Sequence, residues 1–147
     1  MNRHLLPALL FLFFAACKKN IAPQEPAFAG KNWQLVALQS AKEEKILPDD
    51  YGFNMHFEGS RIKGKGACNY LTLFYQWRFA DSIYLFPGES TLIGCDSQRL
   101  AWDKLYAEAM VKVRAFNMPD SNRLELLCSD GDKIIYKKGV QDTLPGR

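Results

Sequence analysis

The sequence FNMHFEGSRIK at positions 53–63 decides the fold class. Phe53, Met55 and Phe57 alternate with polar side chains, and this two-residue period is typical of a β-strand with one buried face. A Gly-Ser pair at 59–60 follows, and then a second alternating run begins. The stretch therefore predicts a β-hairpin in a sheet that covers a hydrophobic core.

Comparable patterns extend the β-structure on both sides of this hairpin. Gly64, Gly66 and Ala67 are too small to fill a core, so they indicate a bulge or the close approach of another segment. We expect Pro87-Gly88 to end one strand and Asp130-Gly131 to connect the last two. Further strands are predicted at 32–38, near Ile46, and at 73–79, 83–86, 114–118, 124–128 and 134–136.

One helix is predicted at about 97–112, where Asp96 or Ser97 can accept hydrogen bonds from the free N–H groups. Consecutive hairpins favour an antiparallel sheet, and curling the sheet removes its exposed edges. The sequence thus predicts a mainly β fold, a small antiparallel β-barrel with one amphipathic helix at one end. The expected apolar stripe of the helix comprises Ala101, Trp102, Leu105, Tyr106, Ala109, Met110 and Val113.

The composition restricts the classes of function. The chain has 147 residues, 48% of them apolar, and a formal net charge of +3. This balance is typical of one globular domain and argues against a dedicated nucleic-acid binder. The sequence has two histidines, His4 and His56, which disfavours a histidine-rich metal site and most histidine-based catalysis. We expect no cofactor, no metal site and no nucleic-acid partner.

Residue types that serve in catalysis occur without the patterns that catalysis needs. No serine lies in a Gly-x-Ser-x-Gly elbow. The acid pairs Asp49-Asp50 and Asp130-x-Asp132 occur in turn contexts, where such side chains usually bond to the backbone. His56 lies on the face opposite to the apolar residues of its strand, as surface histidines do. The sequence therefore predicts that the protein is not an enzyme.

The N-terminus has the features of an export signal. An apolar stretch at 5–16 has 12 residues, which suits a signal peptide and falls short of the roughly 20 that cross a bilayer. Small residues before Cys17 resemble the lipobox of bacterial lipoproteins, in which the signal is removed and the cysteine is acylated. A plain secretory signal followed by a chance cysteine is the alternative. By the same resemblance, the lack of Asp after Cys17 favours the outer membrane.

These features divide the chain into four parts. Residues 1–16 are the predicted lipoprotein signal peptide, and 17–29 are the lipidated cysteine and a flexible tether. Residues 30–138 form one barrel domain, and 139–147 form a polar tail. We therefore expect the protein in the cell envelope, anchored by lipid at the periplasmic face of the outer membrane.

Short motifs in the barrel segment occur in a recognisable order. They are Trp33-x-Leu35, the stretch 57–64, Cys68-Asn69, Tyr75, a Thr-x-x-x-Cys segment at 91–95 before the helix, Leu124-x-Leu126, the 130–131 turn and Ile135. This order resembles the META domain family, named also for the heat-shock protein HslJ. The resemblance implies a lipocalin-like barrel with one helix, often exported or lipid-anchored. It also implies a link to stress tolerance without established enzymatic activity.

The remaining cysteines are interpreted with this family in mind. Cys68 and Cys95 match cysteines of the family, and export into an oxidising compartment favours a disulfide between them. Reduced buried thiols are one alternative. A redox-active or metal-binding pair is another, although the Cys-x-x-Cys spacing and histidine partners of such sites are missing. Cys128 alternates with Leu124 and Leu126, which predicts a buried core thiol.

Binding is the favoured class of function. Residues 51–86 contain ten aromatic side chains, more than one face of each strand can hold, so a candidate binding patch is predicted at Phe74 and Trp77. Arg61, Lys63 and Lys65 alternate beside it and fit acidic lipid headgroups or an acidic partner. The alternatives are a core filled by aromatic residues and a solvated basic face.

Three functions remain open from the sequence. The first is a monomeric binding or assembly module that supports the envelope under stress through an unknown envelope protein. The second is a carrier of a small ligand or lipid in a barrel cavity, which an apolar cavity would favour. The third is an inhibitor of a periplasmic hydrolase.

Overall fold

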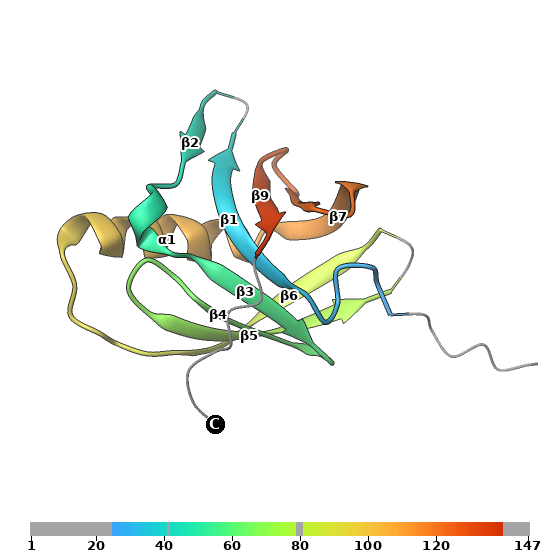
Figure 1. Ribbon diagram of the computed structural model, residues 1–147, viewed down its shortest axis with the longest axis horizontal. Coiled ribbons are helices and arrows are strands. Elements are labelled where there is room, and N and C mark those ends of the chain that lie inside the picture. The colour runs from blue at the N-terminus through green and yellow to red at the C-terminus, as the bar shows by residue number, and fades with distance from the viewer. Residues whose placement is uncertain (1–24, 41, 79–80, 140–147) are drawn as a thin grey trace, which may run out of the picture.

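The computed structural model describes residues 25–40, 42–78 and 81–139, which form one curled sheet and one α-helix (Figure 1). The strands are β1 (Asn32–Gln39), β2 (Glu44–Ile46), β3 (Asn54–Glu58), β4 (Arg61–Lys65), β5 (Tyr70–Trp77), β6 (Ile83–Ser90), β7 (Val113–Asp120), β8 (Arg123–Cys128) and β9 (Lys133–Lys138). The helix α1 (Ser97–Met110) lies between β6 and β7 in sequence, and a single 3-10 turn, η1 (Asp49–Tyr51), precedes β3.

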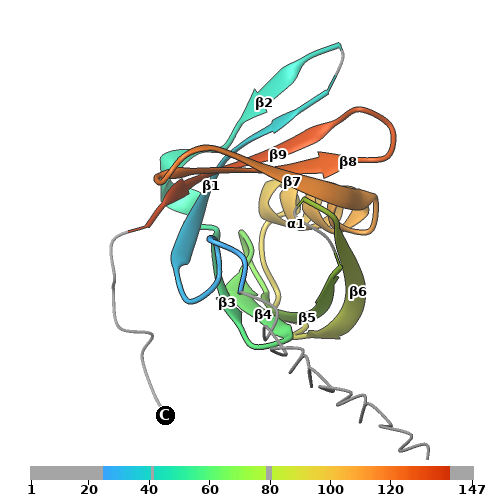
Figure 2. The same cartoon turned by 90° about the vertical axis from the view of Figure 1, so that its right-hand side faces the viewer.

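The sheet is antiparallel throughout and follows the order β6-β5-β4-β3-β1-β9-β8-β7, with β2 paired to β1. It curls so far that the edge strands β6 and β7 come side by side (Figure 2). They meet through one bridge, Ser82 with Ala115, and the N–H of Phe116 donates to the carbonyl oxygen of Asp81 at 2.8 Å. The predicted mainly β class is confirmed. The expected barrel is a half-barrel, because its edge strands β6 and β7 meet only over a short stretch.

The core forms where the predicted alternation points inward. Trp33 and Leu35 of β1 are buried, as are Met55 and Phe57 of β3. Among the described residues, the buried residues of the hydrophobic core lie between positions 28 and 136. This core draws on strands from both ends of the sheet and on the helix.

The predicted helix is present, but its boundaries and its buried face differ from the expectation. It ends at Met110 rather than 112, and Asp96 caps it by accepting hydrogen bonds from two backbone N–H groups. Tyr106 and Met110 are its buried residues, whereas Ala101 and Leu105 of the expected stripe are exposed. The reason is geometric: α1 crosses one end of the half-barrel (Figures 1 and 2), and the two residues that it buries there are four positions apart.

The prediction that Pro87-Gly88 ends a strand was wrong. Strand β6 continues through both residues to Ser90. A proline is tolerated because β6 is an edge strand, where the missing N–H breaks no ladder hydrogen bond. The register shifts opposite this point, between Thr72 and Phe74. A Cβ atom at Gly88 would overlap the carbonyl oxygen of Thr72, so the glycine permits the close contact.

The close approach predicted near Gly64 and Gly66 is confirmed. A Cβ atom at Gly64 would overlap the carbonyl oxygen of Asn54 on β3. One at Gly66 would overlap the carboxylate of Asp103, which α1 brings against this loop. The glycine at 66 thus lets the helix come close to the end of β4, and the glycine at 64 lets the backbone of β3 approach.

Several predictions concern residues that the structure does not describe. The signal segment, Cys17 and most of the predicted tether lie outside the described residues, as does the polar tail beyond Gly139. Within the described part of the chain, no helix has both the length and the apolar character needed to cross a membrane.

Candidate functional site

A pocket of about 220 Å³ lies between α1 and the inner face of β5 and β6. Its walls are mostly apolar and come from elements that are distant in the sequence. Leu71, Leu73 and Leu85 contribute from the sheet, and Met110 and Val111 from the end of the helix. The other lining residues are Asn69, Phe86, Pro87, Gly88, Glu89, Ser90, Asp103, Tyr106 and Ala107.

The pocket exists because the sheet does not close beside β6. Past the bridge at Ser82, no strand among the described residues pairs with the free edge of β6. The leucines of β5 point inward but remain half-buried, since α1 presents the small side chain of Ala107 toward them. The result is an apolar hollow that opens at the sheet edge, which is a usual form of a small-ligand site.

The polar residues at the rim set the charge of the pocket. Asn69, Glu89, Ser90 and Asp103 lie there, and no lysine, arginine or histidine is part of the lining. An anionic ligand would therefore meet two carboxylates and no cationic partner. The rim favours an uncharged ligand.

Asp103 is held by a hydrogen-bond clamp from the loop that contains Ala67, Cys68 and Asn69. Its Oδ1 accepts from the N–H of Ala67 at 2.7 Å and from that of Cys68 at 3.4 Å. Its Oδ2 accepts from the backbone N–H and from Nδ2 of Asn69, each at 3.0 Å. Four donors from one loop thus satisfy a single carboxylate, and hydrogen bonds to a charged acceptor are the strong kind. The clamp fixes the helix to the loop after β4.

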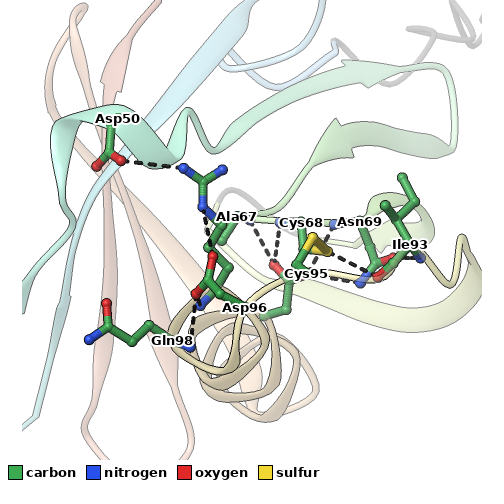
Figure 3. Close-up of polar contacts among 10 residues, drawn as sticks. Asp50, Ala67, Cys68, Asn69, Ile93, Cys95, Asp96 and Gln98 are labelled. Atoms are coloured by element: carbon green, nitrogen blue, oxygen red, sulfur yellow. Dashed lines mark hydrogen bonds and ion pairs between the residues drawn. A yellow bond between two sulfur atoms is a disulfide. The ribbon is translucent and has the colours of Figure 1, made fainter.

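Asn69 and the disulfide extend this clamp to the segment before the helix. The Oδ1 atom of Asn69 accepts from the N–H of Ile93 at 2.8 Å and from the hydroxyl of Thr91 at 3.3 Å. A disulfide joins Cys68 to Cys95, with their Cα atoms 6.2 Å apart (Figure 3). Closing a loop of this size contributes about 3–4 kcal/mol in the chain-entropy account. The 91–95 segment is thereby fixed at one end of the pocket.

A buried polar cluster attaches the middle of the helix to the sheet. The hydroxyl groups of Tyr106 and Tyr136 lie 2.8 Å apart and both contact Sδ of Met55. Burial raises the pKa of Tyr106 and of Tyr136 well above the usual value for tyrosine. Both phenols therefore stay neutral and serve in packing rather than as a reactive group, and Tyr106 also lines the pocket.

The start of the helix has a separate attachment. Arg99 makes ion pairs with Asp50 at 3.3 Å and with Asp96 at 3.4 Å. Its guanidinium also lies 5.1 Å from the ring centre of Tyr51. Arg99 thus links η1 to α1, and the acidic residue at position 50 serves in structure, as turn carboxylates usually do.

The predicted binding patch is divided between two faces. Arg61, Lys63 and Lys65 face outward on β4, where their register partners on β5 are Phe74, Thr72 and Tyr70. The guanidinium of Arg61 lies 5.8 Å from the ring centre of Phe74. Trp77 instead packs half-buried against the core, and its buried Nε1 has no partner among the described residues. The grouping of Trp77 with Phe74 was therefore wrong.

The outward residues form a larger surface than the sequence indicated. Four aromatic side chains on it are between 39% and 52% exposed. We define the basic-aromatic face as Arg61, Lys63 and Lys65 of β4, Tyr70 and Phe74 of β5, and Tyr84 and Phe86 of β6. Arg78 and Arg114 lie at one end of it, with their guanidinium groups 5.8 and 6.0 Å from the ring centre of Tyr84.

His56 and Cys128, which the sequence analysis also singled out, lie where they can serve in packing. His56 lies in a recess of about 290 Å³, and its Nδ1 is 2.8 Å from Oδ1 of Asn32. Cys128 is a free, buried thiol, as its alternation predicts, and burial raises its pKa to about 11. Among the described residues, no group of three or more His, Cys, Asp or Glu side chains could hold a metal ion.

The sequence model of the META domain matches residues 16–141, most of the chain. The protein belongs to the META domain family. An NMR structure of a protein from Burkholderia xenovorans superposes on this META domain with a TM-score of 0.67 at 13% identity, over 96% of this chain and 100% of the other. A crystal structure of a DUF4847 family protein from Bacteroides vulgatus gives 0.58 at 17% identity, over 78% and 96%. These likenesses establish the fold, and no curated protein matches the sequence.

Several important residues of this META domain were not found from the sequence. Asp103 lies outside the predicted apolar stripe of the helix, although the small residues at Gly64 and Gly66 indicated that some segment would approach. Ala107 and Val111 lie outside the predicted apolar stripe. An alanine opposite two inward leucines could have indicated a hollow, but only if the position of the helix were known.

Proposed function

We propose that this META domain is a non-enzymatic binding module of the bacterial cell envelope that takes an uncharged apolar group into the pocket between α1 and β5–β6. The observation that supports it is the pocket itself, which has apolar walls from Leu73, Leu85 and Met110 and lacks a basic side chain in its lining. At about 220 Å³ it is smaller than the roughly 300–1,000 Å³ of sites that enclose a whole drug-sized ligand. It therefore fits part of a ligand, such as the end of one acyl chain.

Hydrophobic transfer supplies the affinity of such a site. Each methylene that leaves water for the pocket contributes about 0.8 kcal/mol. The pocket is already formed, because the clamp at Asp103 and the disulfide hold the helix and the 91–95 segment in place. Little ordering is then required on binding, which favours affinity.

The place of action is part of the proposal. A lipid on Cys17 would hold the domain at the envelope, within reach of lipids and lipoproteins whose acyl chains could enter the pocket. Such a role accords with the stress-tolerance functions that the family resemblance implies. Growth with labelled palmitate tests the anchor, because a Cys17→Ala variant should lose the label.

Binding to the pocket can be tested with an uncharged apolar dye, N-phenyl-1-naphthylamine, whose fluorescence rises in apolar surroundings. We expect saturable binding, with displacement by octanol at lower concentration than by octanoate, because the rim is acidic. Displacement by octanoate at equal or lower concentration would contradict the assignment of an uncharged ligand.

A matched pair of helix variants locates the dye. Ala107→Leu places a larger side chain in the pocket, whereas Ala101→Leu makes the same change at an exposed helix position outside it. The first should weaken dye binding several-fold and the second should leave it unchanged. Equal effects of the two variants, or no effect of Ala107→Leu, would place the dye elsewhere.

A further inference from the structure

We propose that the basic-aromatic face is a docking surface for the phosphate headgroups of an anionic lipid bilayer. Apart from Phe86, which also borders the pocket at the sheet edge, this face lies on the outside of the strands whose inner side forms the pocket. The inference does not depend on what the pocket binds. The argument rests on charge, on the exposure of aromatic side chains and on the geometry of three adjacent strands.

The spacing of the basic residues suits a planar array of phosphates. Arg61, Lys63 and Lys65 occupy alternate positions of β4 and so point to one side. Alternate residues of a strand are about 6.8 Å apart, so the three charges extend along about 14 Å. A bilayer offers anionic groups over such a distance, and long basic side chains can reach them while their stems cover apolar surface.

Most of this charge is not neutralised within the protein. Among the described residues, Arg61 and Lys65 form no ion pair, and neither do Arg78 and Arg114 at the end of the face. Lys63 pairs with Glu58 at 3.1 Å, with both side chains at least half exposed. Exposed pairs of this kind contribute little and exchange readily for another anion. The face therefore keeps a net positive charge.

The aromatic residues provide the second half of a membrane contact. In register, Arg61 lies beside Phe74 and Phe74 beside Phe86, so a cation and two rings form one row across the sheet. Tyr70 and Tyr84 flank this row and are 52% and 39% exposed. Tyrosine is typical of the membrane–water interface, where its ring is apolar and its hydroxyl stays hydrated.

Vesicle sedimentation tests the proposal. The chain from residue 18 onward contains the core described above and lacks Cys17, so any binding comes from the polypeptide and not from an attached lipid. We expect it to bind vesicles that contain phosphatidylglycerol at about 0.1 M salt, and to be released at about 1 M salt, where charges are screened beyond about 3 Å. Binding to pure phosphatidylcholine should be much weaker.

The decisive variant replaces Arg61, Lys63 and Lys65 by glutamine. Each basic residue near an anionic surface contributes about a fivefold gain in binding, so the triple variant should lose about a hundredfold. The control variant replaces Lys42, Lys104 and Lys137 by glutamine. It loses the same amount of positive charge, but from other parts of the surface. Its binding should fall far less.

The outcomes separate the membrane from other acidic partners. Equal losses of vesicle binding in the two triple variants would mean that net charge alone drives binding, and this would overturn the proposal. Binding to soluble polyglutamate without binding to anionic vesicles would favour an acidic protein instead. A Phe74→Gln variant that binds the vesicles as well as the parent chain would contradict the role of the aromatic row.

Discussion

The two halves of this META domain are stabilised by different means. In the closed half, β1, β3, β8 and β9 bury Trp33, Leu126 and Tyr136 completely, and no disulfide joins the described residues of these strands. In the open half, β5 and β6 leave a hollow against α1, and leucines of the sheet remain half-buried. There, a disulfide and the clamp at Asp103 hold the segments in place.

This difference shows which part of a small half-barrel can contain a pocket. A hollow lowers the number of dispersion contacts around it, so packing contributes less stability there. Polar and covalent attachments compensate at the pocket's end, where the loop after β4 and the 91–95 segment meet the helix. The same sheet thus combines a tightly packed core with a preformed binding site.

The largest expected effect compares one substitution in both halves. Leu126→Ala removes a fully buried side chain of β8 and should lower the free energy of unfolding by about 2–5 kcal/mol. Leu73→Ala removes a half-buried side chain that already borders a hollow, and should cost about 1 kcal/mol. Urea denaturation of both variants gives the two values.

The comparison would fail if the two costs were equal. A large loss in Leu73→Ala would mean that the hollow is tightly packed in solution and unable to accept a ligand. Circular dichroism at a low urea concentration serves as the control, because both variants must start from the same folded state for the free energies to be comparable.

The sequence predicted the closed half better than the open half. Local alternation at Met55 and Phe57 decides which side faces a core, and neither residue needs information from distant segments. The pocket depends on where Ala107 lies relative to Leu73, which only tertiary packing determines. The continuation of β6 past Pro87 likewise depends on its being an edge strand.

The candidate site was predicted in part for the same reason. Outward positions on β4 follow from alternation, so Arg61, Lys63 and Lys65 were placed together correctly. Trp77 was grouped with Phe74 by composition, although the two-residue period already assigned them to opposite faces. The acceptor of four N–H donors, Asp103, has no local signature, because its partners are more than 30 residues away.

A smaller effect is expected from the clamp. Asp103→Asn keeps one oxygen acceptor but places an amide nitrogen against one set of N–H donors, so two charge-assisted hydrogen bonds are lost. The freed donors are only partly buried and can bond to water, so the free energy of unfolding should fall by about 1.5–3 kcal/mol, less than the sum for two such bonds. Asp81→Asn serves as the control, since its side chain takes part in no clamp among the described residues.

Hydrogen exchange at the loop after β4 sharpens this test. The amides of Ala67 and Asn69 should exchange faster in Asp103→Asn, while amides of β8 should be unaffected at low denaturant. Uniform acceleration in both halves would show that the clamp contributes to global stability alone. It would then have no special role in shaping the pocket.

The smallest expected effect concerns the thiol of the closed half. Burial, with Asp130 and Asp132 nearby, raises the pKa of Cys128 to about 11, above that of an unfolded thiol. The folded state therefore holds this proton more tightly, so the stability that it contributes is complete below about pH 8.5 and is lost as the pH rises toward 11. The free energy of unfolding, measured by urea denaturation, should decline between pH 8 and 10, and the decline should be weaker in Cys128→Ala. This window lies below the region in which the buried tyrosines would dominate, so the difference between the two proteins isolates the thiol.

The reactivity of the same thiol measures how well the closed half excludes water. At pH 8, the raised pKa lowers the thiolate fraction roughly a hundredfold relative to an unfolded chain, so a disulfide reagent should react with Cys128 slowly until urea is added. Fast reaction in the folded state, together with a pH profile identical to that of Cys128→Ala, would mean that β8 opens readily. The contrast between a packed half and a hollow half would then not hold in solution, because the half without the pocket would also open readily.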